Sequence, residues 1–479
     1  MSGEVVPSIG EPSDAGPEDG PEGRGALGIP GRSIAGQVLW LAGPVFVEQS
    51  LLYLIGLSDT VVAGRYLGAD DLAGVTVANY LLWALGTLFT IASVGGTALV
   101  ARSVGAGRWD EAVRYCGQAF AVGLGLGAAA LALIQAFARP LVSTMNLSGP
   151  SAAAAVLFLR IVAAVSPLLA CTAVGNACLR GAGDTRTGMK VMVLMNAVNV
   201  GLTWLLAVGW GPVPALGLAG IAIGTAFGEG IGGLVMLMLL ARGRSGLRLG
   251  AANLRPERAA VARLLRISLP AAGDSITNVG CQLWFLGLIN RLGPIATAAH
   301  GVAIRCEAIA FLTISAFAVA ASTLAGQYLG ARRPRRAARA AATAWVMGMA
   351  FLSLLGVALY TRGEAMFQVF LAGRQPEVLV EGVDVLRIVA LAMPALATIN
   401  VLNGTLNGSG DTRWPWAITL AGYLLVRIPM TYLLTLPAAG GGFEMGLRGA
   451  WIAMFADLHV RALLVGGRFL GGGWLKARV

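Results

Sequence analysis

Charged residues are scarce in this sequence. Only 12% of its 479 residues are charged, whereas 56% are hydrophobic and the mean hydropathy is +0.74. Soluble domains normally contain about 25% charged residues, so the composition excludes a soluble globular fold and predicts a polytopic membrane protein. The sequence also lacks a strand pattern. We therefore expect an all-α membrane protein, with short loops and no large soluble domain.

Histidines are few and the cysteines show no pairing pattern, which limits the chemistry. The two histidines, His300 and His459, do not lie in an HExxH motif, so an intramembrane enzyme is the less favoured alternative. We expect no catalytic residues, no cofactor and no metal centre. The cysteines are odd in number and have no CxxC spacing, which disfavours disulfides and a zinc site: they are Cys116, Cys171, Cys178, Cys281 and Cys306.

The net charge of +11 does not indicate nucleic-acid binding, because the basic residues lie in short loops between apolar runs. Residues 1–34 are rich in Gly and Pro and contain six acids, a composition that predicts a disordered tail. This segment has no apolar core after a basic start, so we do not interpret it as a signal peptide.

Twelve apolar runs are each long enough to span a bilayer. The short loops after even-numbered runs contain 19 Lys and Arg, against 6 after odd-numbered runs. The positive-inside rule therefore places the even loops and both termini in the cytoplasm, in a multi-pass protein of the plasma or inner membrane. The runs are 38–64, 72–100, 110–137, 151–178, 189–209, 217–241, 261–291, 296–326, 337–360, 377–407, 414–436 and 446–470.

An internal repeat divides the chain into two halves. The motif Leu179-Arg-Gly-Ala-Gly-Asp-Thr-Arg186 recurs as Leu406-Asn-Gly-Ser-Gly-Asp-Thr-Arg413 at an offset of 227, and Pro44 matches Pro270 at 226. Each half holds six spans, so we expect two pseudo-symmetric six-helix lobes around a central cavity, related by an axis along the membrane normal. The expected units are a tail (1–34), an N-lobe (35–241), a basic cytoplasmic linker (242–260) and a C-lobe with a short tail (261–479).

The first apolar run carries two acids and a proline. Glu48 and Asp59 are eleven residues apart, which is about three helical turns and places both on one helix face. Charges at membrane depth are costly, and Pro44 kinks a helix, so this segment is typical of a transporter. The repeat aligns Glu48 with Asp274, whereas Asp59 has no acidic counterpart in the second half.

The sequence resembles the multidrug and toxic compound extrusion (MATE) antiporters. The resemblance spans about residues 35–476, and it implies a V-shaped pair of bundles that exports amphipathic, often cationic compounds in exchange for H⁺ or Na⁺. Its motifs are Pro44 with Asp59-Thr60, Gly64, Leu67-Gly68 and Leu72-Ala73, then Leu179 to Thr185 with its second copy, Arg427-Ile428-Pro429, Arg468-Phe469 and Gly473-Trp474.

The resemblance also implies a coupling site. Asp59 matches the first-helix aspartate that the family uses for cation coupling, and Asn199 and Thr225 match its polar neighbours. Thr203 stands where the family often has a further aspartate, so a complete Na⁺ cage is not expected. Because a proton needs only one desolvated carboxylate, we favour H⁺, with Na⁺ at Asp59 as the alternative. Asn278 replaces an acid that some branches have.

Other polar residues have structural as well as functional interpretations. Glu48, Asn196, Thr203 and Asn278 could contribute to the cavity or to coupling, or could join helices by hydrogen bonds. Asp184 and Asp411 are expected to make turns or cap helices, Arg427 needs a partner, and Asp457, His459 and Arg461 could pair locally. The expected partners are a small-molecule substrate and the lipid bilayer, for a monomer. A flippase of lipid-linked precursors is the alternative transport function, and it would favour a cationic cavity.

Overall fold

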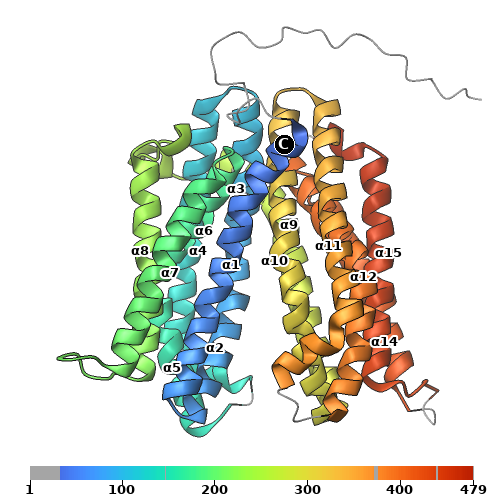
Figure 1. Cartoon of the computed structure of the whole chain (residues 1–479). Coiled ribbons are helices and arrows are strands. Elements are labelled where there is room, and N and C mark those ends of the chain that lie inside the picture. Colours follow the sequence, from blue (N-terminus) through green and yellow to red (C-terminus); the bar gives the residue numbers. More distant parts are fainter. Residues whose placement is uncertain (1–32, 146, 372–375, 438–440, 478–479) are drawn as a thin grey trace, which may run out of the picture.

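The protein consists of helices arranged in two bundles (Figure 1). The computed structural model describes residues 33–145, 147–371, 376–437 and 441–477. Residues 1–32 lie outside the described residues, so the predicted disordered tail remains a prediction. The first described residue, Ser33, caps the first helix, because its hydroxyl accepts a hydrogen bond from the Gly36 amide at 3.2 Å.

The first bundle, the N-lobe, contains α1 to α8, and the second bundle, the C-lobe, contains α9 to α15. The N-lobe helices are α1 (Ile34–Tyr66), α2 (Ala69–Gly86), α3 (Thr90–Gly105), α4 (Trp109–Ser143), α5 (Gly149–Ala163), α6 (Ser166–Gly181), α7 (Thr185–Val208) and α8 (Leu218–Ala241). The C-lobe helices are α9 (Arg258–Arg291), α10 (Pro294–Gly330), α11 (Pro334–Leu371), α12 (Pro376–Ser409), α13 (Arg413–Ala421), α14 (Ile428–Thr435) and α15 (Gly446–Leu470).

These helices account for the twelve predicted spans, three of which are broken. The second span is α2 and α3 with a 3₁₀ turn between them, the fourth is α5 and α6 with a bend of 59°, and the eleventh is α13 and α14 joined by a π-helix, Gly422–Arg427. Within the described residues, ten segments are long and apolar enough to cross a membrane, or eleven with the bent pair. The remaining helix, α9, is 34 residues long but is diluted by Asp274, Asn278 and Gln282.

The lobes meet where α3 packs against α9 and α10 and where α1 packs against α10, and the contact of α3 with α10 lies at the end of the molecule that carries the basic even-numbered loops. A Cβ atom on Gly105 would overlap the carbonyl oxygen of Gln327, and one on Gly330 would overlap the carbonyl oxygen of Arg102. The two contacts are reciprocal, because Gly105 and Arg102 match Gly330 and Gln327 at an offset of 225. This symmetry agrees with an axis that runs between the lobes along the membrane normal.

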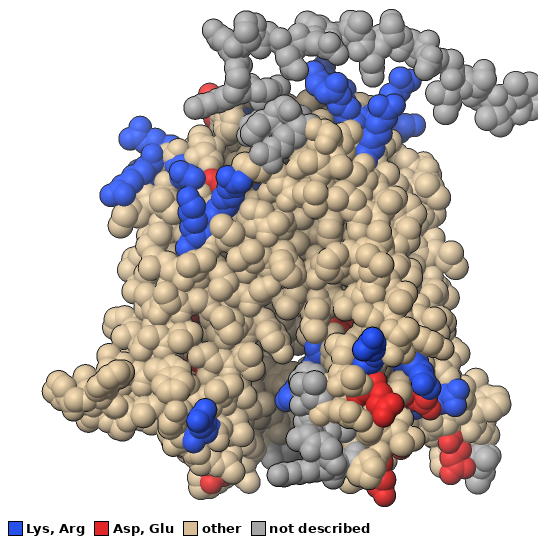
Figure 2. Space-filling view, in the orientation of Figure 1, with Lys and Arg blue, Asp and Glu red and all other residues tan. Residues whose placement is uncertain are grey.

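Hydrogen bonds close the same end. The Thr323 hydroxyl donates to the carbonyl of Arg180 at 3.1 Å, and the Gln327 amide donates to the carbonyl of Gly181 at 2.9 Å. At the opposite end the lobes diverge in Figure 1, and Figure 2 shows the surface hollowed between them in the lower half of the view. Lys and Arg gather at the closed upper end, whereas the lower end carries both signs of charge.

An ion pair between a loop aspartate and an arginine occurs once in each lobe. Asp184 accepts a hydrogen bond from Arg244 at 3.2 Å, and Asp411 accepts one from Arg468 at 2.6 Å. Asp184 also caps α7, as predicted, by accepting from the Thr187 amide at 2.9 Å. The prediction that Asp411 caps a helix is wrong, because the residue before α13 is Thr412 and the Asp411 carboxylate is turned to Arg468.

The glycines spaced four apart on α8 serve packing inside the N-lobe. Cβ atoms on Gly220, Gly224 and Gly228 would meet α7 at Leu206, Thr203 and Asn199, respectively. Small residues allow the two backbones to approach closely, since a membrane provides little hydrophobic force between helices. This approach brings the polar face of α7 against α8.

Candidate functional site

Three predicted coupling residues converge in the N-lobe. Asp59 lies on α1 and is 1% exposed. The Thr225 hydroxyl on α8 donates to Asp59 Oδ2 at 2.8 Å, and the Asn199 amide on α7 donates to Thr225 Oγ1 at 3.0 Å. A chain of hydrogen bonds therefore joins α7, α8 and α1, and it ends on a carboxylate.

This cluster contains buried oxygen atoms that have no hydrogen-bond partner in the described structure. Asp59 Oδ1, Asn199 Oδ1 and Thr203 Oγ1 are buried and have no hydrogen-bond partner among the described residues. An ion pair that would neutralise Asp59 is likewise absent from the described part of the chain. Buried acceptors without donors are costly, and a carboxylate without a cation more so, so the arrangement favours binding of a positive charge.

Glu48 occupies a different environment on the same helix. It accepts hydrogen bonds from Arg180 Nη2 at 2.7 Å and from Asn176 Nδ2 at 2.9 Å, both on α6. Glu48 is thus an ion-paired residue that ties α1 to α6 near the closed end of the lobes. Asn196, which shares a helix face with Asn199, donates back to the Met192 carbonyl of its own helix at 3.1 Å.

The C-lobe contains a cluster of opposite character beside its π-helix. Asp457 lies 2.9 Å from both Arg427 and Arg461, so the predicted partner of Arg427 and the predicted Asp457–Arg461 pair are one ion-paired triad. The ring of Tyr423 lies under both guanidinium groups, at 4.8 and 4.5 Å, and its hydroxyl donates to Asn278 at 2.6 Å. Asn278 therefore supports this cluster and is remote from Asp59.

Two glutamates inside apolar runs were missed by the sequence interpretation. Glu229 on α8 is half-buried, and Glu307 on α10 is 5% exposed. An acid inside an apolar run is the signal that singled out Glu48 and Asp59, and each of these glutamates is the only acid in its run. The interpretation followed positions implied by the family resemblance, where neither glutamate appears.

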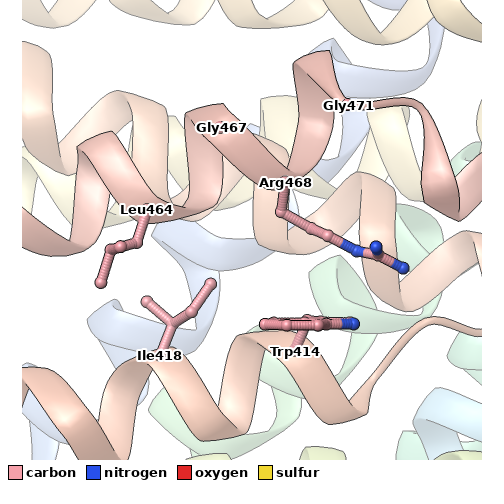
Figure 3. A pocket seen from close by; sticks show the side chains of 6 residues that line it. All are labelled: Trp414, Ile418, Leu464, Gly467, Arg468 and Gly471. Atoms are coloured by element: carbon pink, nitrogen blue, oxygen red, sulfur yellow. The ribbon is translucent and has the colours of Figure 1, made fainter.

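A surface groove lies elsewhere, between α13 and α15 at the basic end of the C-lobe (Figure 3). Its volume is about 320 Å³. The Arg468 guanidinium lies over the Trp414 ring at 4.9 Å, while its charge is already neutralised by Asp411. The groove is thus separate from the Asp59 cluster, which the N-lobe builds within itself.

Metal and disulfide chemistry find no support in the described residues. No group of three His, Cys, Asp or Glu side chains that could hold a metal ion occurs in them. The five cysteines are buried and free. The polar chemistry of the described chain therefore resides in hydrogen-bonded and ion-paired clusters inside each lobe.

A family model described as MatE matches residues 44–205 and 270–433. These two ranges begin 226 residues apart, and each lies in one lobe. Together they cover more than half of the chain. The chain belongs to the MatE family. Members of this family are transporters, so the intramembrane-enzyme alternative is excluded and the family resemblance is confirmed.

Curated relatives of this MatE transporter match over nearly their full length. The chain is 28% identical over 449 residues to "Probable multidrug resistance protein NorM" of Thermotoga maritima, covering 92% of this chain and 94% of the relative. It is also 28% identical over 444 residues to "Multidrug resistance protein MdtK" of Yersinia pestis, covering 90% and 94%. These matches agree with a multi-pass membrane protein.

Solved MATE structures share the fold of this MatE transporter. One, described as the outward-facing conformation of a multidrug resistance MATE family transporter of the MOP superfamily, has a TM-score of 0.84 at 20% identity, covering 96% of this chain and all of that one. The likeness confirms the predicted two-lobed helical membrane architecture.

Proposed function

We propose that this MatE transporter is a secondary active antiporter that exports amphipathic, cationic compounds in exchange for H⁺ or Na⁺. The observation that carries the proposal is Asp59, a buried carboxylate with hydrogen-bonded polar neighbours and no basic partner among the described residues. An unpaired intramembrane acid of this kind is typical of a coupling site. Relatives named as multidrug resistance proteins support the choice of substrate class.

The coupling ion proposed in the first instance is H⁺. Asp59 supplies one carboxylate, and the free acceptors around it, Asn199 Oδ1 and Thr203 Oγ1, are neutral oxygens. A proton satisfies a single desolvated carboxylate, whereas a metal cation needs several oxygen ligands at once. Na⁺ remains the alternative because these neutral oxygens could join Asp59 in binding it.

Exchange would proceed by alternating access between the two lobes. The hollow seen in Figure 2 opens away from the basic end, and we assign that basic end to the cytoplasm together with both termini. Reversal requires separation of α3 from α10 and loss of the hydrogen bonds from Thr323 and Gln327. A cation at Asp59 would bias this equilibrium if it binds one conformation more tightly than the other.

The flippase alternative has less support. A cavity for polyanionic lipid-linked precursors should present unpaired basic side chains. Of the arginines in the C-lobe spans, Arg427 and Arg461 both pair with Asp457 and are 2% and 4% exposed, whereas Arg305 of α10 is exposed and makes no ion pair with the described residues. A cationic substrate instead suits a molecule whose N-lobe keeps an unpaired carboxylate.

The test is transport of ethidium by purified protein in liposomes with an imposed pH gradient or, separately, an imposed Na⁺ gradient. We expect one of the gradients to drive transport by the unmodified protein. Asp59→Asn mimics the neutral form permanently, so gradient-driven transport should be lost while the protein remains folded. Glu48→Gln is the comparison on the same helix and should retain coupled transport, because Glu48 is engaged with Arg180.

Gradient-driven transport at the unmodified rate by Asp59→Asn would show that coupling resides elsewhere. Absence of any gradient dependence in the unmodified protein would contradict antiport altogether. Size-exclusion chromatography of each variant separates loss of coupling from loss of folding.

A further inference from the structure

A second carboxylate, Glu229, lies one helical turn from Thr225 on α8. Residues four apart share a helix face, so Glu229 projects from the face whose Thr225 hydroxyl binds Asp59. Glu229 makes no hydrogen bond or ion pair with the described residues. The N-lobe thus contains two neighbouring acids and no base to neutralise them.

The helices packed against α8 carry no base that pairs with Asp59 or Glu229 in the described structure. On α1 the other acid, Glu48, is paired with Arg180 of α6, and the basic residue Arg65 is exposed beside Tyr66. Arg160 of α5 donates to the carbonyl of Gln135 on α4 at 3.3 Å. The basic residues of α7, Arg186 and Lys190, are exposed at the beginning of that helix. Each of these basic side chains is therefore bonded to another group or lies exposed, and none pairs with Asp59 or Glu229.

The surroundings of the acid pair also favour a cation. In the described structure Asp59 Oδ1 and Asn199 Oδ1 are buried acceptors without donors, and the Thr203 hydroxyl is buried without a hydrogen-bond partner. Close packing of α7 on Gly224 and Gly228 holds these oxygens beside α8. Two like charges in a desolvated site are unfavourable unless a cation lies with them.

We infer that Glu229 is the second anionic group of the coupling site, and that it raises the affinity of the site for the monovalent cation bound at Asp59. This inference rests on the proposed antiport function. It also explains how the site operates with Thr203 where the family often has an aspartate, because the second carboxylate comes from α8 in place of α7.

The test measures cation binding through thermal unfolding of the purified protein, since a ligand that binds the folded state raises its midpoint. Na⁺ is titrated against K⁺ at constant ionic strength and alkaline pH, and H⁺ is titrated in Na⁺-free buffer. We expect Glu229→Gln to need on the order of ten-fold more of the active cation for half-maximal stabilisation, as loss of one neighbouring charge shifts affinity by about one logarithmic unit. Glu229→Asp, which keeps the charge, should recover most of the affinity.

Glu307→Gln is the matched control, because it is the same substitution at a buried glutamate of the C-lobe and should leave the cation midpoint unchanged. A merely structural role of Glu229 would lower the unfolding temperature at every cation concentration without moving the midpoint. The inference is overturned if folded Glu229→Gln needs the same cation concentration for half-maximal stabilisation as the unmodified protein. It is also overturned if Glu229→Asp needs as high a cation concentration as Glu229→Gln. Loss of all cation dependence in the unmodified protein, or its full retention in Asp59→Asn, instead overturns the proposed function.

Discussion

In the N-lobe the buried carboxylate of Asp59 accepts a hydrogen bond from a hydroxyl, whereas in the C-lobe the buried carboxylate of Asp457 lies between two guanidinium groups. In the proposed function the first group binds a cation from solution, whereas the second is ion-paired with two arginines of the fold. Burial alone therefore does not distinguish a coupling acid from a structural one. The distinguishing feature is whether the surrounding helices provide a base.

The second difference between the lobes concerns the aligned acids Glu48 and Asp274. Glu48 binds Asn176 and Arg180, and the matching positions at offset 227 are Asn403 and Asn407. Both of these asparagines have a buried Oδ1 without a hydrogen-bond partner in the described structure. The second half thus keeps the acid and one asparagine, but a neutral asparagine replaces the arginine of the ion pair.

The largest expected difference between the lobes is in stability. Asp457→Asn leaves two buried guanidinium groups without a counter-charge, and removal of one member of a buried ion pair costs about 3–5 kcal/mol of unfolding free energy. Asp59→Asn leaves no buried basic group without a counter-charge, so its free energy of unfolding should stay within about 1 kcal/mol of the value for the unmodified protein. Thermal unfolding in detergent measures both.

A double variant sharpens this test. Asp457→Asn combined with Arg461→Gln leaves one uncompensated charge in place of two, so it should be more stable than Asp457→Asn alone. Equal stability of Asp457→Asn and Asp59→Asn would remove the distinction between the two buried carboxylates.

A smaller difference is expected at the aligned acids. Glu48→Gln removes a charge-assisted hydrogen bond to partly buried Arg180, which should cost about 1.5–3 kcal/mol. Asp274→Asn should cost about 1 kcal/mol or less, because Asp274 has no ion pair of its own in the described structure and an amide oxygen can still accept from Thr419. The unfolding temperatures of the two variants provide the comparison, and a larger loss for Asp274→Asn would contradict it.

Sequence reasoning predicted the fold because hydropathy, loop charge and the repeated motif each depend on local residue types. The breaks at Thr87–Phe89 and Gly422–Arg427 were not predicted, since they alter backbone hydrogen bonding without changing apolar content. Residues Asp59, Asn199 and Thr225 were placed together by family resemblance, and the structure brings them together. Glu229 required knowledge of which face of α8 meets α1.

The choice among basic partners was likewise beyond the sequence. Nothing in the spacing of Glu48 and Arg180, which are 132 residues apart, indicates that they meet. Asp411 was misjudged for a related reason: its motif matches that of Asp184, but the capping role depends on where the next helix begins and on which arginine lies near. Local similarity predicts backbone geometry better than it predicts side-chain partners.

The smallest expected difference concerns the two loop aspartates. Asp184→Ala removes the cap of α7 and should cost about 1 kcal/mol, within the usual range of about 0.5–2 kcal/mol for such caps. Asp411→Ala removes an ion pair without a cap and should cost less, about 0.2–1 kcal/mol, as a partly exposed pair contributes little. The difference between the variants in unfolding temperature at neutral pH measures the contribution of the cap.

The stability that the Asp184 carboxylate contributes should depend on pH. Burial alone would raise the pKa of Asp184, but hydrogen bonds from Ser245 and Thr187 and the charge of Arg244 outweigh it and lower the pKa below its ordinary value of 3.8. A carboxyl whose folded pKa is depressed contributes stability that is fully present above the unfolded value and is lost as pH falls through the folded one. The cost of Asp184→Ala should therefore be constant near neutral pH and shrink only when the pH falls below about 3.8. If the loss of unfolding free energy in Asp184→Ala already declines between pH 7 and pH 5, the partners of Asp184 do not keep its carboxylate ionised.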